Sequence, residues 1–194
     1  MPIFNRLPDN PCLDKMLSTF DFCLPTRSTA VPHTPDWLHE IKYDGYRLRL
    51  ERDRTRVRLI TRGGYDWSKR YPWIIESALK NRHKQFVIDG EAVILGLDGI
   101  SDFDALFSGK HNEEVQLYAF DCLALDGHDL RELPLSMRKS NLERLLARRP
   151  DGIFVAPFEQ GEIGPGSVSC RLPAWFQSGG TGLTRLARRS IGSR

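Results

Sequence analysis

Alternating polar and apolar side chains predict a β-hairpin in residues 47–61. Arg47–Glu51 and Arg56–Thr61 each alternate between the two kinds of side chain, as a strand does when one of its faces is buried. The polar segment Asp53–Thr55 lies between them and is short enough to form a turn. We therefore expect the two segments to pair as antiparallel strands.

Two other segments place apolar residues at helical spacings. Tyr71–Lys84 does so, and Leu135–Arg149 repeats leucines at this spacing before Pro150. A shorter helix is predicted near Asp102–Phe107. Both longer segments are predicted to be surface helices with one buried side.

Two apolar segments between these helices predict central strands. They are Phe86–Leu95 and Val115–Asp121. Helices and strands do not alternate regularly along the chain, and the hairpin requires antiparallel pairing. The predicted fold class is therefore α+β, with antiparallel sheet flanked by helices.

The chain divides into three parts by composition. Residues 1–36 contain six prolines and little periodicity, which predicts an irregular N-terminal arm. Residues 37–165 hold the predicted helices and strands. Residues 166–194 are predicted to be a disordered tail, because from Gly161 onward the chain has seven glycines, five serines and five arginines but no lysine.

Composition adds limits but does not identify a partner. With 194 residues and a net charge of +3, the chain can bury one core, and the charge is too small to indicate nucleic-acid binding by itself. No run of 18 apolar residues and no signal peptide are present, so we expect a cytoplasmic protein without a membrane segment. The four cysteines and five histidines lack ligand spacing, so no metal-binding residue is assigned.

The first candidate for chemistry is the segment Glu40–Arg47, which contains Lys42, Gly45 and Arg47. A lysine amine becomes a nucleophile when cationic neighbours or desolvation lower its pKa, and Arg47 is such a neighbour. Gly45 would permit close backbone approach to a ligand, and Arg47 could meet a phosphate or a ribose. The alternative is an exposed, charged entrance to a strand.

Three further motifs follow along the chain. Asp89-Gly90-Glu91 places two acids on one face of an apolar strand, which suits ribose or metal contacts but also a solvated strand end. Tyr118–Asp121 offers an aromatic platform on which a base could stack, although a core aromatic is the alternative. Thr61–Gly64 is a turn whose Arg62 could reach a phosphate.

In chain order the four motifs are Lys-x-Asp-Gly-x-Arg, Thr-Arg-Gly-Gly, Asp-Gly-Glu and Tyr-x-Phe-Asp. In this order and at these separations, they resemble the motifs of the covalent nucleotidyltransferases. The similarity is to the adenylation domain of bacterial ATP-dependent DNA ligases and covers about residues 20–165. Residues 37–47 and 87–91 are similar to the ligases of bacterial end joining. An RNA ligase or a capping-type enzyme, which shares the Lys-x-Asp-Gly-x-Arg pattern, is a further interpretation.

The resemblance implies an ATP-grasp-like covalent nucleotidyltransferase fold and a lysyl-AMP intermediate. Lys42 would be the catalytic nucleophile, and the expected cofactors are ATP and Mg²⁺ or Mn²⁺. The expected partners are nicked double-stranded DNA and end-joining repair proteins, and the expected state is a monomer. The residues implied to bind the nucleotide are Glu40 at the adenine edge, Arg47 at ribose or phosphate, Arg62 at phosphate, Glu91 at the ribose and Phe120 stacked on adenine.

The same resemblance implies a DNA-binding surface on the hairpin and the segment after it. Such a surface would neutralise duplex phosphates, whereas the alternative is a solvated hairpin face. The candidate contributors are Arg49, Arg52, Arg54, Arg56, Arg58, Arg62, Lys69 and Arg70.

The chain departs from the family pattern after the Tyr-x-Phe-Asp motif. The family continues with a Glu-Gly-x-Val-x-Lys strand, a Trp-x-Lys-x-Lys strand and an OB-fold domain, and none of these occurs here. We therefore expect an adenylation fold that is incomplete at its C-terminus. The alternative function is a non-catalytic ligase remnant that binds ATP or DNA weakly.

A shift of reading frame would account for the tail. Ala174–Arg194 can be translated back into possible codons, and these can be read starting one nucleotide earlier. A permitted choice of third bases then encodes most of the missing lysine strand and the start of the tryptophan strand. The possible codons of Gly166–Trp175, read one nucleotide later, can encode a sequence of the sort that precedes the lysine strand in the family. We hypothesise two register changes, and the codons of the gene test the hypothesis directly.

Overall fold

The computed structural model describes residues 20, 22, 37–41, 43–148, 151–160 and 186–189. Most of the predicted arm, Lys42 and most of the predicted tail lie outside these residues. None of the helices within the described ranges has the length and apolar character needed to cross a membrane.

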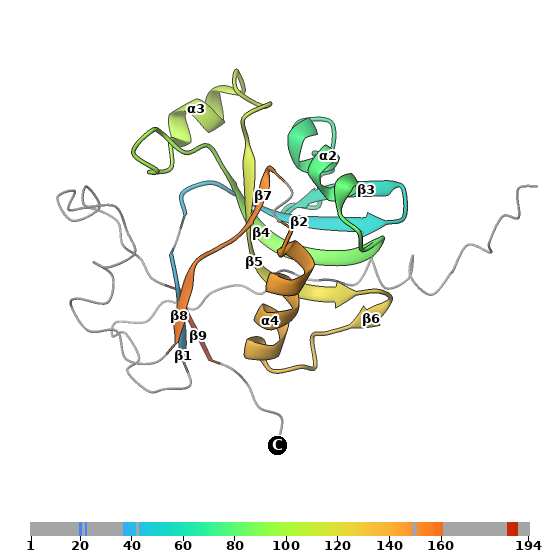
Figure 1. The fold of residues 1–194 in the computed structure, drawn as a ribbon. Helices are drawn as coiled ribbons and strands as arrows, with labels where there is room; N and C mark the ends of the chain where they lie inside the picture. The colour runs from blue at the N-terminus through green and yellow to red at the C-terminus, as the bar shows by residue number, and fades with distance from the viewer. Residues whose placement is uncertain are drawn as a thin grey trace, which may run out of the picture.

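Most of the fold is built on one six-stranded sheet (Figure 1). Five of its strands lie in the order β3-β2-β4-β5-β6, and neighbours in that order pair antiparallel, whereas β7 pairs with β5 in parallel. The predicted α+β class with antiparallel sheet is confirmed. The strands are β2 (Tyr46–Asp53), β3 (Arg56–Thr61), β4 (Gln85–Val93), β5 (Gln116–Leu125), β6 (His128–Asp129) and β7 (Ile153–Val155).

A smaller three-stranded sheet lies beside the first, on the left in Figure 1. Its central strand is β1 (Trp37–Glu40), which pairs antiparallel with β8 (Phe158–Gln160) and with β9 (Leu186–Arg189). β9 falls within the segment predicted to be a disordered tail. The rest of the tail is outside the described residues, so its disorder stays a prediction.

The predicted hairpin is confirmed as β2 and β3. The two longer predicted helices are confirmed but are shorter, and the short one is confirmed one residue later than predicted. The helices are α2 (Pro72–Lys80), α3 (Phe103–Ser108) and α4 (Leu135–Leu146). The prediction carried the first of these to residue 84, but Asn81 is extended and ends it. The buried Arg52 guanidinium donates to the carbonyls of Ala78 and Leu79 and to that of Asn81.

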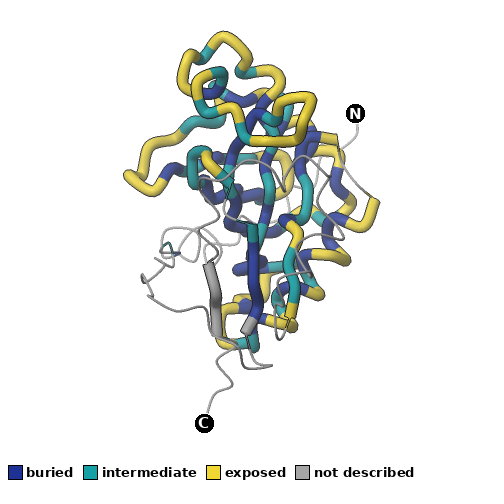
Figure 2. The backbone as a smooth tube through the Cα atoms, turned by 90° about the vertical axis from the view of Figure 1, so that its left-hand side faces the viewer, coloured by how far each residue is buried: buried dark blue, intermediate teal, exposed yellow. Residues whose placement is uncertain are grey.

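The main core lies between one face of the large sheet and helices α2 and α4. Figure 2 shows buried positions concentrated along the strands and exposed positions on the peripheral loops. Alternate residues of each strand point to this core, as the period of two requires. The core includes Leu48 and Leu50 of β2, Ile88 of β4, Leu117 of β5, Ile74 of α2 and Leu142 of α4.

Candidate active site

The opposite face of the large sheet carries charged side chains. On β2, Arg47, Arg49 and Glu51 alternate with the core leucines. The register pairs Arg47 with Glu91 and Arg49 with Asp89 across the β2–β4 ladder. As predicted from the alternation, Asp89 and Glu91 therefore share one face of β4.

Arg47 is held by a bidentate ion pair with Asp89. Its Nε lies 3.1 Å from Oδ1 and its Nη2 lies 2.6 Å from Oδ2. The guanidinium carbon lies 5.0 Å from the ring centroid of Phe120 and 5.5 Å from that of Phe22. The Asp89 side chain is 3% exposed, so this charge-assisted pair is shielded from water. The arrangement fixes a cation beside an aromatic ring.

A bulge in β5 presents Phe120 to this face. Asp121 pairs with Asp89 and Ala119 pairs with Gly90, so Phe120 is the extra residue between them. Bulges of this kind redirect a side chain and are frequent beside active sites. A Cβ on Gly90 would lie 2.8 Å from the Tyr118 carbonyl oxygen, so glycine permits the close approach of the two strands. The predicted aromatic platform is therefore built by a local irregularity.

Lys42 lies outside the described residues, but Tyr43, which follows it, is described. The Tyr43 ring centroid lies 4.5 Å from that of Tyr118, which in turn lies 5.4 Å from that of Phe154. Burial raises the pKa of the Tyr43 hydroxyl well above its usual value, and the neighbouring Tyr118 adds to this shift. These contacts anchor the residue after Lys42 on β5.

Gly45 lies close to another strand. A Cβ at this position would overlap the Ala92 carbonyl oxygen and lie 2.8 Å from Val93 Cγ1. The close approach is therefore to strand β4, and glycine is required here for packing within the protein. The predicted approach of a ligand to this glycine stays a prediction.

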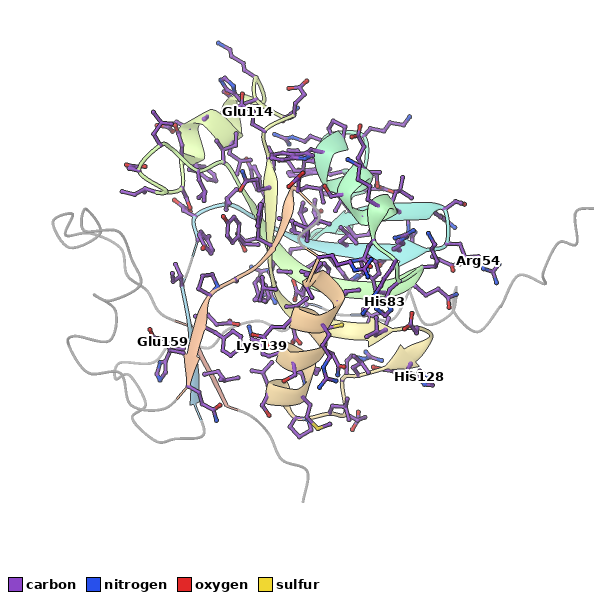
Figure 3. The ribbon with its side chains drawn as sticks, in the orientation of Figure 1. Arg54, His83, Glu114, His128, Lys139 and Glu159 are labelled. Carbon is purple, nitrogen blue, oxygen red and sulfur yellow. The ribbon has the colours of Figure 1, made fainter. Side chains whose placement is uncertain are left out.

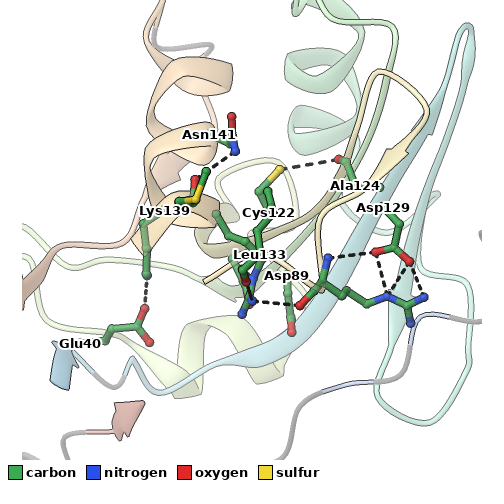
Figure 4. A network of polar contacts seen from close by, with 12 residues as sticks. Glu40, Asp89, Cys122, Ala124, Asp129, Leu133, Lys139 and Asn141 are labelled. Atoms are coloured by element: carbon green, nitrogen blue, oxygen red, sulfur yellow. Dashed lines mark hydrogen bonds and ion pairs between the residues drawn. The ribbon is translucent and has the colours of Figure 1, made fainter. Parts of the chain in front are cut away.

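Glu40 is buried at the end of β1 and pairs with Lys139 of α4 (Figure 4). The Lys139 Nζ also lies 4.9 Å from the ring centroid of Phe158 on β8. Figure 3 shows Lys139 extending from α4 toward the small sheet. One lysine therefore joins α4 to two strands of that sheet.

Sequence reasoning missed Lys139 and its neighbour Arg138. Arg138 forms a second buried contact, with Nε 2.9 Å from Asp121 Oδ1 and Nη2 3.1 Å from Asp121 Oδ2. The helical periodicity contained a signal for Lys139. This lysine lies at helical spacing from Leu135, Leu142 and Leu146, which are all buried, so it belongs to the same side of the helix. A lysine on the apolar stripe of a helix indicates a buried partner.

Two further predicted nucleotide contacts lie at the same end of the sheet as Arg47. Glu91 is partly buried on β4. Arg62 is exposed in the turn after β3, and because Thr61 pairs with Leu48, this turn follows at the Arg47 end of β2. The positions of Glu91 and Arg62 are thus described, but their predicted roles as nucleotide contacts are not tested and stay predictions.

The predicted DNA-binding residues separate by burial: Arg58 and Arg70 are partly buried, and the other six are either buried or exposed. Arg52 is fully buried against the end of α2, and Arg49 is nearly buried and bonded to Glu51, so neither belongs to a surface. Glu51 also pairs with Arg58 at 2.6 Å. The exposed contributors are Arg54, which projects from the hairpin turn in Figure 3, and Arg56, Arg62 and Lys69.

No group of three or more histidine, cysteine or acidic side chains that could hold a metal ion is found among the described residues. Cys122 is buried in the core, and burial raises the pKa of its thiol to about 12, so it is neither a ready ligand nor a nucleophile.

Comparisons with known proteins indicate a family for this chain. Residues 21–162 match the family model for the ATP dependent DNA ligase domain. The chain is 34% identical over 136 residues to the multifunctional non-homologous end joining protein LigD of Pseudomonas aeruginosa, and 35% identical over 136 residues to LigD of Mycobacterium tuberculosis. Each match covers 68% of this chain.

The structural comparison points to the same proteins. A solved mycobacterial DNA ligase D complexed with ATP and MES is 32% identical with a TM-score of 0.61, and the match covers 72% of this chain and 46% of that one. The chain spans only 16% of the Pseudomonas LigD and 18% of the Mycobacterium LigD. Because the family model matches most of its length, the chain belongs to the family of ATP-dependent DNA ligase domains.

Proposed function

We propose that this chain carries the nucleotidyl-transfer step of an ATP-dependent DNA ligase, in which AMP becomes covalently attached to Lys42. The observation that carries the proposal is the Arg47–Asp89 pair beside Phe120, on the sheet face next to the segment that contains the lysine. A fixed cation suits a phosphate or ribose, and an aromatic ring suits a base. Family membership supports the same chemistry.

In the proposed reaction, the Lys42 amine attacks the α-phosphorus of ATP. A P–N bond forms, the P–O bond to the β-phosphate breaks, pyrophosphate leaves and the amine gives its proton to solvent. Phosphoryl transfer depends mainly on positioning and on cations that balance the developing charge. The proposed roles are Arg47 and Arg62 at phosphate or ribose, Glu91 at the ribose hydroxyls, Phe120 on adenine and Glu40 at the adenine edge.

Mg²⁺ or Mn²⁺ is proposed as a partner of the triphosphate and not as a resident ion. Among the described residues no three histidine, cysteine or acidic side chains gather into a metal site, whereas Mg²⁺ on a nucleotide is usually held by the phosphates and one or two carboxylates.

Nicked duplex DNA is the proposed acceptor of AMP. Exposed Arg54 and Arg56 at one end of the hairpin, and Arg62 and Lys69 at and beyond its other end, supply positive charge, and such side chains bind duplex phosphates in any sequence. The relatives named for non-homologous end joining support DNA ends as the substrate and repair proteins as partners.

A non-catalytic remnant is the second candidate. The observation that favours it is the absence from the sequence of the two lysine-bearing strands that follow in the family pattern. Such a chain would bind ATP or DNA without forming the covalent adduct.

Incubation with α-labelled ATP and Mg²⁺ separates the two candidates. The purified chain should acquire label that stays attached in denaturing gel electrophoresis and is released by acid, as a P–N bond requires, and Lys42→Ala should acquire none. Lys110→Ala, which changes an exposed lysine after α3, is the matched control and should label like the unmodified chain. Bound but not covalently attached nucleotide would support the remnant, and label that persists in Lys42→Ala would overturn the assignment of the nucleophile.

A further inference from the structure

Part of the chain that precedes β1 in sequence lies on the polar face of the large sheet. Phe20 is 2% exposed and packs with Val87 of β4 and with Leu123 and Ala124 of β5, in an apolar cluster separate from the main core. Val87 is two positions before Asp89, so both point to the same face of β4. Phe20 is therefore anchored on the face that carries the candidate site.

Phe22 lies over two arginines of that face. The centroid of its ring is 5.5 Å from the guanidinium carbon of Arg47 and 5.5 Å from that of Arg49. Both distances are within the range at which an aromatic face attracts a cation. Unlike Phe20, Phe22 is only partly buried. Phe20 thus supplies the apolar contact with the sheet, whereas Phe22 offers its ring to the charged groups.

Each of the two arginines also pairs with a carboxylate. Arg47 binds Asp89 through Nε and Nη2, and Arg49 binds Glu51. A carboxylate restrains a guanidinium through directed hydrogen bonds, whereas an aromatic ring attracts the cation and covers it from water. The ring of Phe22 therefore adds a second kind of restraint to a guanidinium that is already bonded at one edge.

The surroundings of Arg47 combine groups that are distant in sequence. Its guanidinium carbon is 5.0 Å from the ring centroid of Phe120, which belongs to the bulge of β5, as well as close to Phe22. A side chain that is held in place before a ligand arrives loses less freedom when the ligand binds. Phosphoryl transfer in particular depends on cations that are positioned in advance.

We propose that Phe22 is a positioning residue that holds Arg47 in the orientation that binds the nucleotide. This inference rests on the proposed function, in which Arg47 contacts a phosphate or the ribose of ATP. Phe22 acts through the guanidinium and is not assigned a contact with the nucleotide itself. The groups that prepare the nucleotide site therefore include a residue that precedes β1.

A double-mutant cycle on the full chain tests the proposal, with the Kd for ATP measured by equilibrium dialysis. Phe22→Leu keeps an apolar side chain but removes the aromatic face, so ATP binding should weaken by about fivefold. In an Arg47→Met background the same change should have no effect, because the cation on which the ring acts is gone. Phe22→Tyr keeps the ring and should bind ATP like the unmodified chain.

Phe86→Leu is the matched control. The guanidinium carbon of Arg52 lies 5.9 Å from the ring centroid of Phe86 on the core face, so this variant also replaces a phenylalanine beside an arginine. Phe86 is 2% exposed, so thermal stability should fall, while the Kd for ATP should stay the same. An equal loss of ATP affinity in Phe86→Leu and Phe22→Leu would show a general effect of packing and overturn the proposal.

The remaining outcomes also decide the proposal. Unchanged ATP affinity in Phe22→Leu, or an equal loss of affinity in the Arg47→Met background, would show that the ring does not act through Arg47. If Phe22→Leu does not fold, Phe22→Met takes its place in the same cycle. A wild-type chain that labels Lys42 but whose ATP affinity is insensitive to Phe22 overturns this inference alone, whereas one that does not bind ATP overturns the proposed function as well.

Discussion

The two faces of the large sheet are built from the same strands but serve different purposes. One face of β2 presents Leu48 and Leu50 to the core beneath α2 and α4. The other face presents Arg47 and Arg49. Here a guanidinium pairs with a buried carboxylate and contacts aromatic rings. The period of two therefore separates the residues that stabilise the fold from those assigned to the chemistry.

Charge is not confined to one face, and the exception is informative. Arg52 lies on the same side of β2 as the core leucines, yet its guanidinium is satisfied by carbonyls at the end of α2. Burial lowers the pKa of this guanidinium. On the opposite face, the arginines bind carboxylates instead. The same residue type thus caps a helix on one face and orders a polar site on the other.

The largest expected effect comes from the core face. Leu48→Ala should lower the free energy of unfolding by about 3 kcal/mol, because it removes a fully buried side chain and leaves a cavity. Urea denaturation followed by circular dichroism measures the change. Arg56→Ala, at an exposed position of the edge strand β3, is the control and should stay within about 0.5 kcal/mol. Equal losses in both variants would contradict the contrast between the faces.

Arg52→Met should have the next largest effect, a loss of about 2 kcal/mol, because buried carbonyls at the end of α2 lose their donor. Hydrogen exchange at the Asn81 amide should become faster in the same variant, since this amide closes the last turn of the helix. Arg54→Met in the exposed hairpin turn is the matched control. Unchanged exchange in Arg52→Met would rule out the capping role.

On the polar face, Arg47→Met should lower stability by about 2 kcal/mol, because it takes the arginine away from the buried Asp89 carboxylate. It should also weaken ATP binding by about tenfold, because it removes the proposed phosphate contact. Denaturation and equilibrium dialysis provide the two values. Arg58→Met breaks the Glu51 pair farther along the same hairpin and should leave ATP affinity unchanged. If both variants bind ATP equally well, Arg47 has no role in the nucleotide site.

The smallest expected effect on stability at neutral pH comes from the Cys122 thiol in the core. Its folded-state pKa of about 12 lies above the usual 9.0, so the folded chain retains the proton that the unfolded chain loses. The stability that this thiol contributes is complete below about pH 9 and is lost as the pH rises toward 12. Peptide mapping after iodoacetamide treatment at pH 8 should show Cys122 protected in the native chain and alkylated in urea. Rapid native alkylation would contradict its burial.

Several elements could be predicted from local pattern because their signals are short-range. The hairpin follows from alternation across residues 47–61, and α4 follows from its leucine spacing. Asp102 was a recognisable helix start, and its carboxylate accepts from the Ala105 amide as an N-cap. Strands β1, β6, β7 and β8 were not predicted, since none exceeds four residues and their pairing partners lie far away in sequence.

The candidate site also has a part that could be predicted from the sequence and a part that could not. Motif order and spacing singled out Glu40, Arg47, Glu91 and Phe120 as predicted nucleotide contacts, because residue type and separation are properties of the chain itself, and their roles stay predictions. The contacts that orient them were not identified in advance, and Asp121 and the two basic residues of α4 are the main examples. Their partners are contributed by elements that are distant in sequence.

The sequence by itself determined the family, the α+β class and the residues assigned to the nucleotide, because these depend on periodicity and on motifs within single segments. Only the tertiary structure decided which charges face each other: Arg47 binds Asp89, Arg52 caps α2, and Lys139 crosses from α4 to β1. A buried charge must find an opposite charge or a polar group nearby. Which group is near depends on how the sheets and helices pack, and local pattern does not contain that information.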